Sequence, residues 1–394
     1  MRLEPDVRPL DPELTGQTFA GGRCEARMRR LYEKRALAPG YWADYLAIVN
    51  LGSIRLGELP LLDIDLSLPP SRRWLDAGEE YRDWIRDLIE VAWDEMVCEL
   101  PSRARPLFPF LRLGGAAAGR MARLLGGAYA SELRGLCRAS GAPFGKVFLL
   151  NISYDLHQLF ERGGQACSSA SFCDARGRPI LARNLDWHRP KSLGAYSALV
   201  RFWKGNRYLY ESVGFPGFVG VRSAQREGAW AVTLNQSPCV QSRVDLSQMP
   251  ACMHLRAACD RASSYGSLVR QIGPWRAMSP YFTHVVGTRR DQQCLMQNIG
   301  GHYFHHEPFA WGLAQTNHYL DRADGARVNL LAGWRKGERC DRYNLLVGRL
   351  RRRRAKTLED GFGVLRGWPI THGGTIQQMV MRPATGSLRL RVRR

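Results

Sequence analysis

The sequence predicts a fold of the α+β class, in which helices and strands occupy different parts of the chain. Before residue 167, apolar residues recur mainly at the three- and four-residue spacing of helices. After residue 167, short runs of β-branched and aromatic residues alternate with turn residues, as in antiparallel strands. With 394 residues, of which 45% are hydrophobic, the chain can bury a large core. We therefore expect a mostly helical segment over residues 1–166 and a sheet-rich core over residues 167–394.

The first part of the chain is expected to contain five helices and two short strands. The clearest helix covers residues 81–98, where Trp84, Leu88 and Ala92 follow helical spacing. The other helices are expected over 24–37, 111–125, 129–139 and 144–160, and the strands over 48–52 and 61–66.

The second part of the chain is expected to consist mainly of strands. Alternating or continuous apolar runs predict strands over 198–203, 208–213, 219–221, 230–234, 283–288, 294–299, 376–382 and 387–392. Helical spacing predicts helices over 253–262, 264–271 and 342–353.

A hairpin is predicted at the start of this second part. Residues 167–173 alternate with a period of two, and a Gly-Arg-Pro turn at 177–179 leads into a second strand. The serines at 169 and 171 then share a face with Cys167, whereas Ala170 and Phe172 lie on the opposite face. The second strand brings Arg183 and Asp186 back beside the cysteine.

These residue types suit nucleophilic catalysis. A cysteine attacks as its thiolate, so another group must take the thiol proton. The fixed positive charge of Arg183 favours the thiolate and can also donate to a substrate carbonyl. Asp186 can accept a hydrogen bond from an amine and orient it.

The motifs around this hairpin resemble those of the N-terminal-nucleophile cysteine hydrolases of the choloylglycine hydrolase group. The branch most similar to this chain contains acid ceramidase and N-acylethanolamine acid amidase. Its motifs correspond, in the same order, to Leu66–Trp74, Asn151–Asp155, Cys167–Ser169, Arg183–Asp186, Thr233–Asn235 and Gln315–Tyr319. The relatives carry Cys-Thr-Ser at the nucleophile, whereas this chain has Cys-Ser-Ser, which keeps the hydroxyl.

The resemblance implies a four-layer αββα N-terminal-nucleophile hydrolase fold. It also implies cleavage of the chain between Ala166 and Cys167, with the two halves remaining associated. The α-amino group freed on Cys167 would have a pKa of about 8 and could accept the thiol proton. One residue would then supply both nucleophile and base.

Further site residues follow from the same resemblance. Asn235 and Asn317 are the candidates for stabilising an oxyanion. The family also has a late arginine, for which Arg342 is favoured and Arg339 remains open. The residues expected to contact substrate are Tyr154, Phe215, Phe218 and Trp311.

The expected reaction is hydrolysis of a linear amide that bears a lipophilic acyl chain, through a thioester. N-acylethanolamines and ceramide-like lipids are expected ahead of bile-salt conjugates or penicillins. Two alternatives stay open. An acyltransferase would use the same acyl-enzyme with an amine as acceptor. A non-enzymatic protein could bind nucleic acid or membrane through its net charge of +21, although no base-reading motif supports specific nucleic-acid binding.

Composition also bears on cofactors and location. The chain has ten cysteines but no Cys-x-x-Cys pair, so zinc is not expected. The expected amide hydrolysis implies no other metal and no organic cofactor. Residues 1–20 are polar and unlike a secretory signal, which favours a cytoplasmic location. The amphipathic pattern over 111–125 leaves room for peripheral contact with an anionic membrane. The histidines within 302–307 are expected in an exposed loop, and the arginines over 349–354 on a solvated helix end.

Overall fold

The fold is seen in a computed structural model, which describes twelve parts of the chain. They are residues 42–48, 59–99, 125, 127–160, 167–187, 191–237, 245, 247–273, 276–299, 302–320, 340–352 and 355–393. The predicted helices over 24–37 and 111–125 and the predicted strand over 48–52 lie almost wholly outside them, as do Ala166 and Arg339.

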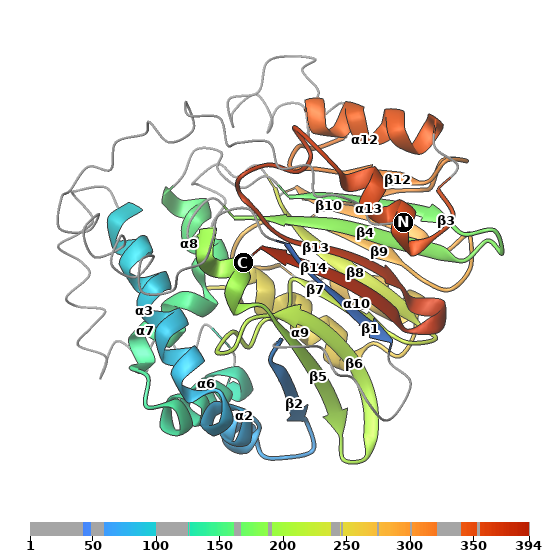
Figure 1. Ribbon diagram of the computed structural model, residues 1–394. Helices are drawn as coiled ribbons and strands as arrows, with labels where there is room; N and C mark the ends of the chain where they lie inside the picture. The colour runs from blue at the N-terminus through green and yellow to red at the C-terminus, as the bar shows by residue number, and fades with distance from the viewer. Residues whose placement is uncertain are drawn as a thin grey trace. The chain divides into compact units, whose positions relative to one another are not determined.

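Two β-sheets form the centre of the structure (Figure 1). The first is antiparallel and contains, in spatial order, β1 (Trp42–Ile48), β14 (Ser387–Arg393), β13 (Thr375–Arg382), β4 (Pro179–Asp186), β3 (Ser168–Cys173) and β12 (Leu313–Gln315). The second contains β11 (His302–His306), β10 (Gln293–Ile299), β9 (Tyr281–Val286), β8 (Trp230–Gln236), β7 (Ser223–Arg226), β6 (Arg207–Gly214), β5 (Ala198–Lys204) and β2 (Leu61–Asp65). In the second sheet, only the β2–β5 pair among the described strands is parallel.

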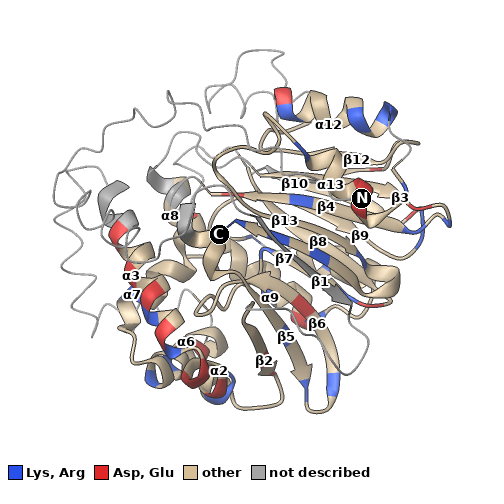
Figure 2. Cartoon of the chain, in the orientation of Figure 1, with Lys and Arg blue, Asp and Glu red and all other residues tan. Residues whose placement is uncertain are grey.

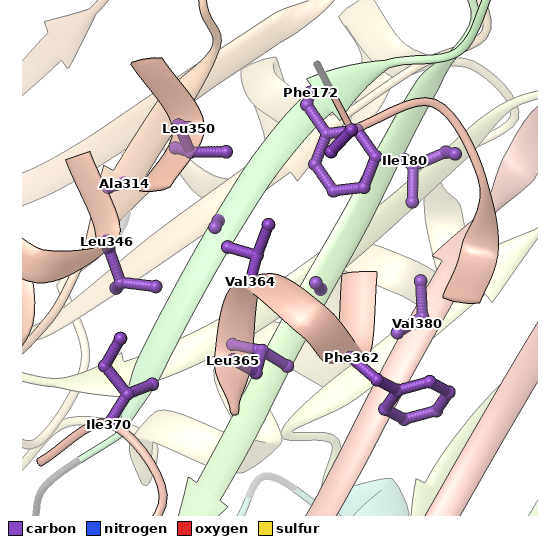
Figure 3. Close-up of a cluster of buried hydrophobic side chains, with 13 residues drawn as sticks. Phe172, Ile180, Ala314, Leu346, Leu350, Phe362, Val364, Leu365, Ile370 and Val380 are labelled. Atoms are coloured by element: carbon purple, nitrogen blue, oxygen red, sulfur yellow. The ribbon is translucent and has the colours of Figure 1, made fainter. Parts of the chain in front are cut away.

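The two sheets pack face to face through a buried apolar layer. Leu181 and Met379 of the first sheet share a cluster with Leu199, Ala231 and Val286 of the second. Because strand side chains alternate between faces, the intervening residues of the first sheet point outward. There they meet α12 (Asp341–Arg352) and α13 (Leu358–Leu365), as Figure 3 shows for the cluster around Phe172, Ile180 and Val364.

Helices α9 (Ala251–Arg261) and α10 (Tyr265–Ile272) cover the second sheet. The guanidinium of Arg256 on α9 lies 4.9 Å from the ring centroid of Phe202 on β5. The layers are therefore helix, sheet, sheet and helix, which confirms the predicted α+β class and αββα architecture.

The described chain before residue 167 also contains helices. They are α2 (Leu75–Glu80), α3 (Arg82–Glu99), α6 (Gly127–Ser140), α7 (Phe144–Asn151) and α8 (Ser153–Phe160). Short 3-10 helices in the described parts of the chain cover Pro70–Arg72, Lys191–Tyr196 and Pro383–Thr385.

The region before residue 167 is tied to the rest by strand pairing and by a buried ion cluster. It supplies an edge strand to each sheet, β1 next to β14 and β2 next to β5. Glu132 on α6 is fully buried and accepts hydrogen bonds from Arg73, Trp74 and Arg256 at 2.8, 2.7 and 3.0 Å. The Arg-Trp pair of the Leu66–Trp74 motif thus has a structural partner that also binds α9.

Most predicted elements are present, and three differ for identifiable reasons. The helix predicted over 144–160 is two helices separated at Ile152, where the side-chain amide of Asn151 binds the backbone of Gly217 and Val219. The strand predicted over 219–221 is wrong, since the N–H groups of Val219 and Val221 donate to Asn151 and Cys252 instead of to a strand.

The loop predicted over 302–307 is also wrong. Residues His302–His306 form β11, which pairs with β10.

The arginines predicted at a helix end lie in the last turn of α12, and Figure 2 shows acidic and basic residues at opposite ends of this helix. This arrangement complements the helix dipole. Within the described residues, no helix is both long and apolar enough to span a bilayer.

Candidate active site

The predicted hairpin places Cys167 directly before β3 and beside the end of β4. The register pairs Ser169 with Arg183 and Ser168 with Asn184. Ser169 and Ser171 face the second sheet, where both contact His284, whereas Ala170 and Phe172 face the helices. The alternation predicted for this strand is therefore present. Cys167 itself is 2% exposed, and its thiol is free.

Arg183 lies against the thiol and is held rigidly. Its Nη2 atom is 3.7 Å from Cys167 Sγ and donates to the carbonyl of Leu234 at 2.6 Å. Its Nη1 atom donates to Ser223 Oγ and, at 3.3 Å, to the carbonyl of Arg222. Burial lowers the pKa of the Arg183 guanidinium, and the neighbouring Cys167 thiol opposes that shift. The guanidinium of Arg183 thus presents a buried positive charge to the sulfur of Cys167.

Asp186 is completely buried beside the same cysteine. Its backbone carbonyl lies 3.9 Å from Cys167 Sγ. Neither carboxylate oxygen has a hydrogen-bond partner within the described parts of the chain, but His372 Nε2 lies 3.3 Å from Oδ2. Such a buried carboxylate is costly unless a donor or a cation compensates it. The carboxylate of Asp186 can therefore accept a further hydrogen bond that no described donor supplies.

His372 is a site residue that the sequence analysis missed. Its Nδ1 atom accepts a hydrogen bond from the N–H of Gly374 at 3.1 Å. A neutral imidazole in that arrangement carries its proton on Nε2, the atom that faces Asp186. Asn184 fixes this loop by donating to the Ile370 carbonyl at 2.8 Å. The central asparagine of the Arg-Asn-Leu-Asp run thus positions the loop that reaches Asp186.

Arg342 and Asn317 lie on the other side of the cysteine. Arg342 Nη1 donates to the Cys167 carbonyl at 2.8 Å and to Ser168 Oγ at 3.1 Å. Its Nη2 atom donates to Asn317 Oδ1 at 3.0 Å, and Asn317 Nδ2 donates to the Gln236 carbonyl at 2.8 Å. Each amide nitrogen carries two N–H groups, so Asn317 keeps one for another acceptor. Arg342 thus lies beside Cys167, whereas Arg339 lies outside the described residues.

Asn235 lies close to the same group at the end of β8. Its Nδ2 atom is 3.4 Å from Ser169 Oγ and 3.3 Å from the Gln315 carbonyl. Ser169 also contacts His284 Nδ1 at 3.1 Å, and burial lowers the pKa of His284 to about 3. His284 is therefore neutral at ordinary pH. A histidine at an inward position of the apolar strand 281–286 was a sequence signal for this buried contact.

The four residues predicted to contact substrate lie in different surroundings. Tyr154 is buried and donates to the Pro280 carbonyl at 3.0 Å. The rings of Phe215 and Phe218 pack on Arg222, whose carbonyl holds Arg183. Trp311 instead stacks on Phe309 and packs against the outer cluster beneath α12. The structure therefore does not bring Trp311 to the thiol.

Asp155, in the Asn151–Asp155 motif, is a fully buried carboxylate that anchors α9. It accepts a hydrogen bond from the Ala251 N–H at 3.2 Å and another from Ser279 Oγ. Burial raises the pKa of this carboxyl group to about 7 from an ordinary value near 3.8. The folded protein consequently keeps a proton that the unfolded chain loses between about pH 4 and pH 7.

Replacing Asp155 by asparagine is expected to change how stability depends on pH. The stabilisation from this group is complete below about pH 4 and is lost as pH rises towards 7. The unfolding free energy of the wild type should therefore fall, relative to D155N, by up to about 1.4 kcal/mol per pH unit across that window. Urea unfolding of both proteins at several pH values measures the difference. A constant difference would contradict the raised pKa, and the exposed substitution Asp291→Asn serves as control.

Metal-binding side chains do not gather at this site. In the described ranges, no group of three or more His, Cys, Asp or Glu residues could hold a metal ion. The reactive groups that the chain itself brings together are a thiol, two guanidinium groups, a carboxylate, an imidazole and two amides.

Comparison with known proteins gives sequence relatives, although no family model matches the chain. The N-acylethanolamine-hydrolyzing acid amidase of Caenorhabditis elegans is 25% identical over 239 residues, which cover 58% of this chain and 64% of that protein. Acid ceramidase of Rattus norvegicus is 23% identical over 193 residues, or 46% of each chain. Acid ceramidase of Mus musculus is 20% identical and covers 66% of this chain and 70% of its own length. The chain thus matches less than two thirds of the first two relatives.

Solved structures give weaker similarities. A Caenorhabditis elegans N-acylethanolamine-hydrolyzing acid amidase ortholog matches 55% of this chain and 93% of its own chain, with a TM-score of 0.48 and 20% identity. Penicillin V acylase from Agrobacterium tumefaciens matches 55% of this chain and 80% of its own, with a TM-score of 0.37 and 13% identity. The sequence relatives confirm the resemblance drawn from the motifs, because this chain is similar in sequence to an N-acylethanolamine-hydrolyzing acid amidase and to acid ceramidase.

Proposed function

We propose that this protein is an autoprocessing cysteine amidase. It hydrolyses the linear amide bond of lipophilic N-acyl substrates through a thioester on Cys167. The observation that carries this proposal is the 3.7 Å contact between Arg183 Nη2 and Cys167 Sγ, at a residue whose carbonyl also binds Arg342. The names of the sequence relatives support N-acylethanolamines and ceramide-like amides as the substrate class.

Cleavage before Cys167 supplies the base in this proposal. The freed α-amino group has a pKa of about 8 and lies on the same residue as the thiol. Asp186 supports this role because its buried carboxylate has no hydrogen-bond partner within the described residues. An amine at Cys167 would donate to it and be held in place.

The reaction then proceeds in two steps. The amine accepts the thiol proton, and the thiolate attacks the amide carbonyl carbon to form a tetrahedral oxyanion. Asn317 and Asn235 donate N–H groups to that oxygen. The amine returns its proton to the departing nitrogen, which leaves a thioester on Cys167. Water then attacks the thioester, with the same amine as base, and releases the fatty acid and the thiol.

The two halves remain associated after cleavage. The region before residue 167 contributes strands β1 and β2 to the two sheets. Glu132 from that region is buried against Arg256 from the other half. These contacts do not depend on the peptide bond between residues 166 and 167.

The intact mass of the purified protein tests processing directly. We expect two fragments, 1–166 and 167–394, that co-purify under native conditions. The Cys167→Ala variant, measured as a control, should give one uncut chain. A wild-type chain that stays uncut and still hydrolyses amides would contradict the α-amino mechanism.

A further inference from the structure

The side chain of Arg222 is buried, and its backbone carbonyl binds Arg183, the arginine that contacts the thiol. It is 5% exposed, and its carbonyl accepts the hydrogen bond from Arg183 Nη1 at 3.3 Å. Its guanidinium carbon lies 4.4 Å from the ring centroid of Trp187 and 4.5 Å from that of Phe218. Trp187 directly follows Asp186 at the end of β4. The side chain therefore belongs to the same end of the sandwich as the thiol.

The polar contacts of Arg222 do not neutralise its charge. Its Nη2 atom donates to Ser153 Oγ at 3.2 Å, and its side chain also contacts the Cys252 thiol, whose pKa is raised by burial to about 11. Its Nε atom is buried without a partner in the described structure. No carboxylate among the described residues forms an ion pair with it. Arg256, a buried arginine on α9, differs because Glu132 and Asp260 both pair with it.

The aromatic rings around Arg222 stabilise a cation without cancelling it. They attract a guanidinium through their π faces but carry no net charge. Burial of a cation without a counter-ion is unfavourable, and the nearby charge of Arg183 adds repulsion. An anion that enters the site would offset both costs and could accept a hydrogen bond from the Nε–H group of Arg222. The cluster of Arg222, Trp187 and Phe218 is thus ready for a negative group that the described chain does not supply.

We propose that Arg222 binds an anionic group on the amine part of the substrate, so that N-acyl amino acids are preferred over N-acylethanolamines. This inference rests on the proposed amidase function. The acyl part of the proposed substrate is lipophilic, which assigns the charge to the amine part. Phe215 and Phe218, predicted to line an acyl passage, would then flank the polar end of the substrate instead.

The test compares two substrates of nearly equal size on the processed protein. N-lauroylglycine ends in a carboxylate, and N-lauroylethanolamine ends in a neutral hydroxyl. We expect kcat/KM to be about tenfold or more higher for the glycine conjugate, because a site built for a partner rejects a substrate that leaves it unpaired. The ratio of the two kcat/KM values is the quantity to follow, since a general loss of activity cancels in it.

Substitutions at Arg222 then assign the preference to this residue. Arg222→Met should reduce the ratio by about tenfold, and Arg222→Lys should retain part of it. Arg289→Met, at an exposed arginine paired with Asp291, is the matched control and should leave the ratio unchanged. Equal kcat/KM values for the two substrates in the wild type would overturn the inference and leave the amidase function standing. A carboxylate preference that survives in R222M would also overturn it. If neither substrate is hydrolysed by processed protein, the proposed function itself fails.

Discussion

Replacing Cys167 by alanine is expected to abolish both cleavage after residue 166 and amide hydrolysis. The substitution removes the only sulfur in contact with Arg183 among the described residues, and no neighbouring side chain can form the thioester. Loss of the nucleophile in comparable enzymes costs roughly 10⁴-fold or more in turnover. Mass spectrometry follows the cleavage, and release of fatty acid from an N-acyl amide follows the turnover.

Cys173 provides a matched control at the far end of the same strand. It is partly buried and contacts Gln293 Nε2 at 3.4 Å, away from Arg183. Cys173→Ala should therefore process and hydrolyse like the wild type. Retention of hydrolysis in C167A would remove this cysteine from the mechanism, whatever the state of the peptide bond.

Replacing Asp186 by asparagine is expected to slow processing and turnover by roughly 10²-fold or more while leaving the fold intact. Asparagine keeps the shape of the side chain but removes the charge that would hold the α-amino group. It also presents an N–H where the amine and His372 Nε2 both need an acceptor. The time course of fragment formation and kcat measure the effect, and circular dichroism checks the fold.

His372 gives a way to separate charge from positioning at this carboxylate. His372→Gln keeps a donor near Asp186 and should lower kcat less than His372→Ala does. The alanine variant removes this donor altogether, so the carboxylate and the α-amino group that it would hold lose part of their positioning. Wild-type processing in D186N, or equal kcat values in both His372 variants, would rule out the orienting role of this pair.

The hairpin around Cys167 was predictable because its signals are local. Strand side chains alternate strictly, so the run 167–173 alone determines which residues face the thiol. The turn at 177–179 then specifies that the next strand returns beside it. Arg183 and Asp186 could be assigned to the site on this basis before any long-range contact was known.

The residues that sequence analysis missed come from segments far away in the chain. His372 reaches Asp186 because Asn184 binds the backbone at Ile370, and Ser223 reaches Arg183 across the two sheets. No spacing rule connects such positions. The helix break at Ile152 lies beside another such contact, since the Asn151 side chain binds the backbone of Gly217 and Val219. Local periodicity predicted these helices, but it carries no information on such long-range contacts.

The edge strands β1 and β2 have a consequence for how the molecule can be denatured and recovered. An uncut precursor unfolds and refolds as a single polymer, so its melting temperature is independent of dilution. Once the chain is cut, recovery requires two separate polypeptides to meet, because each sheet draws its outermost strand from the first of them. Thermal melting of the mature form then becomes concentration-dependent and poorly reversible, as for an obligate heterodimer.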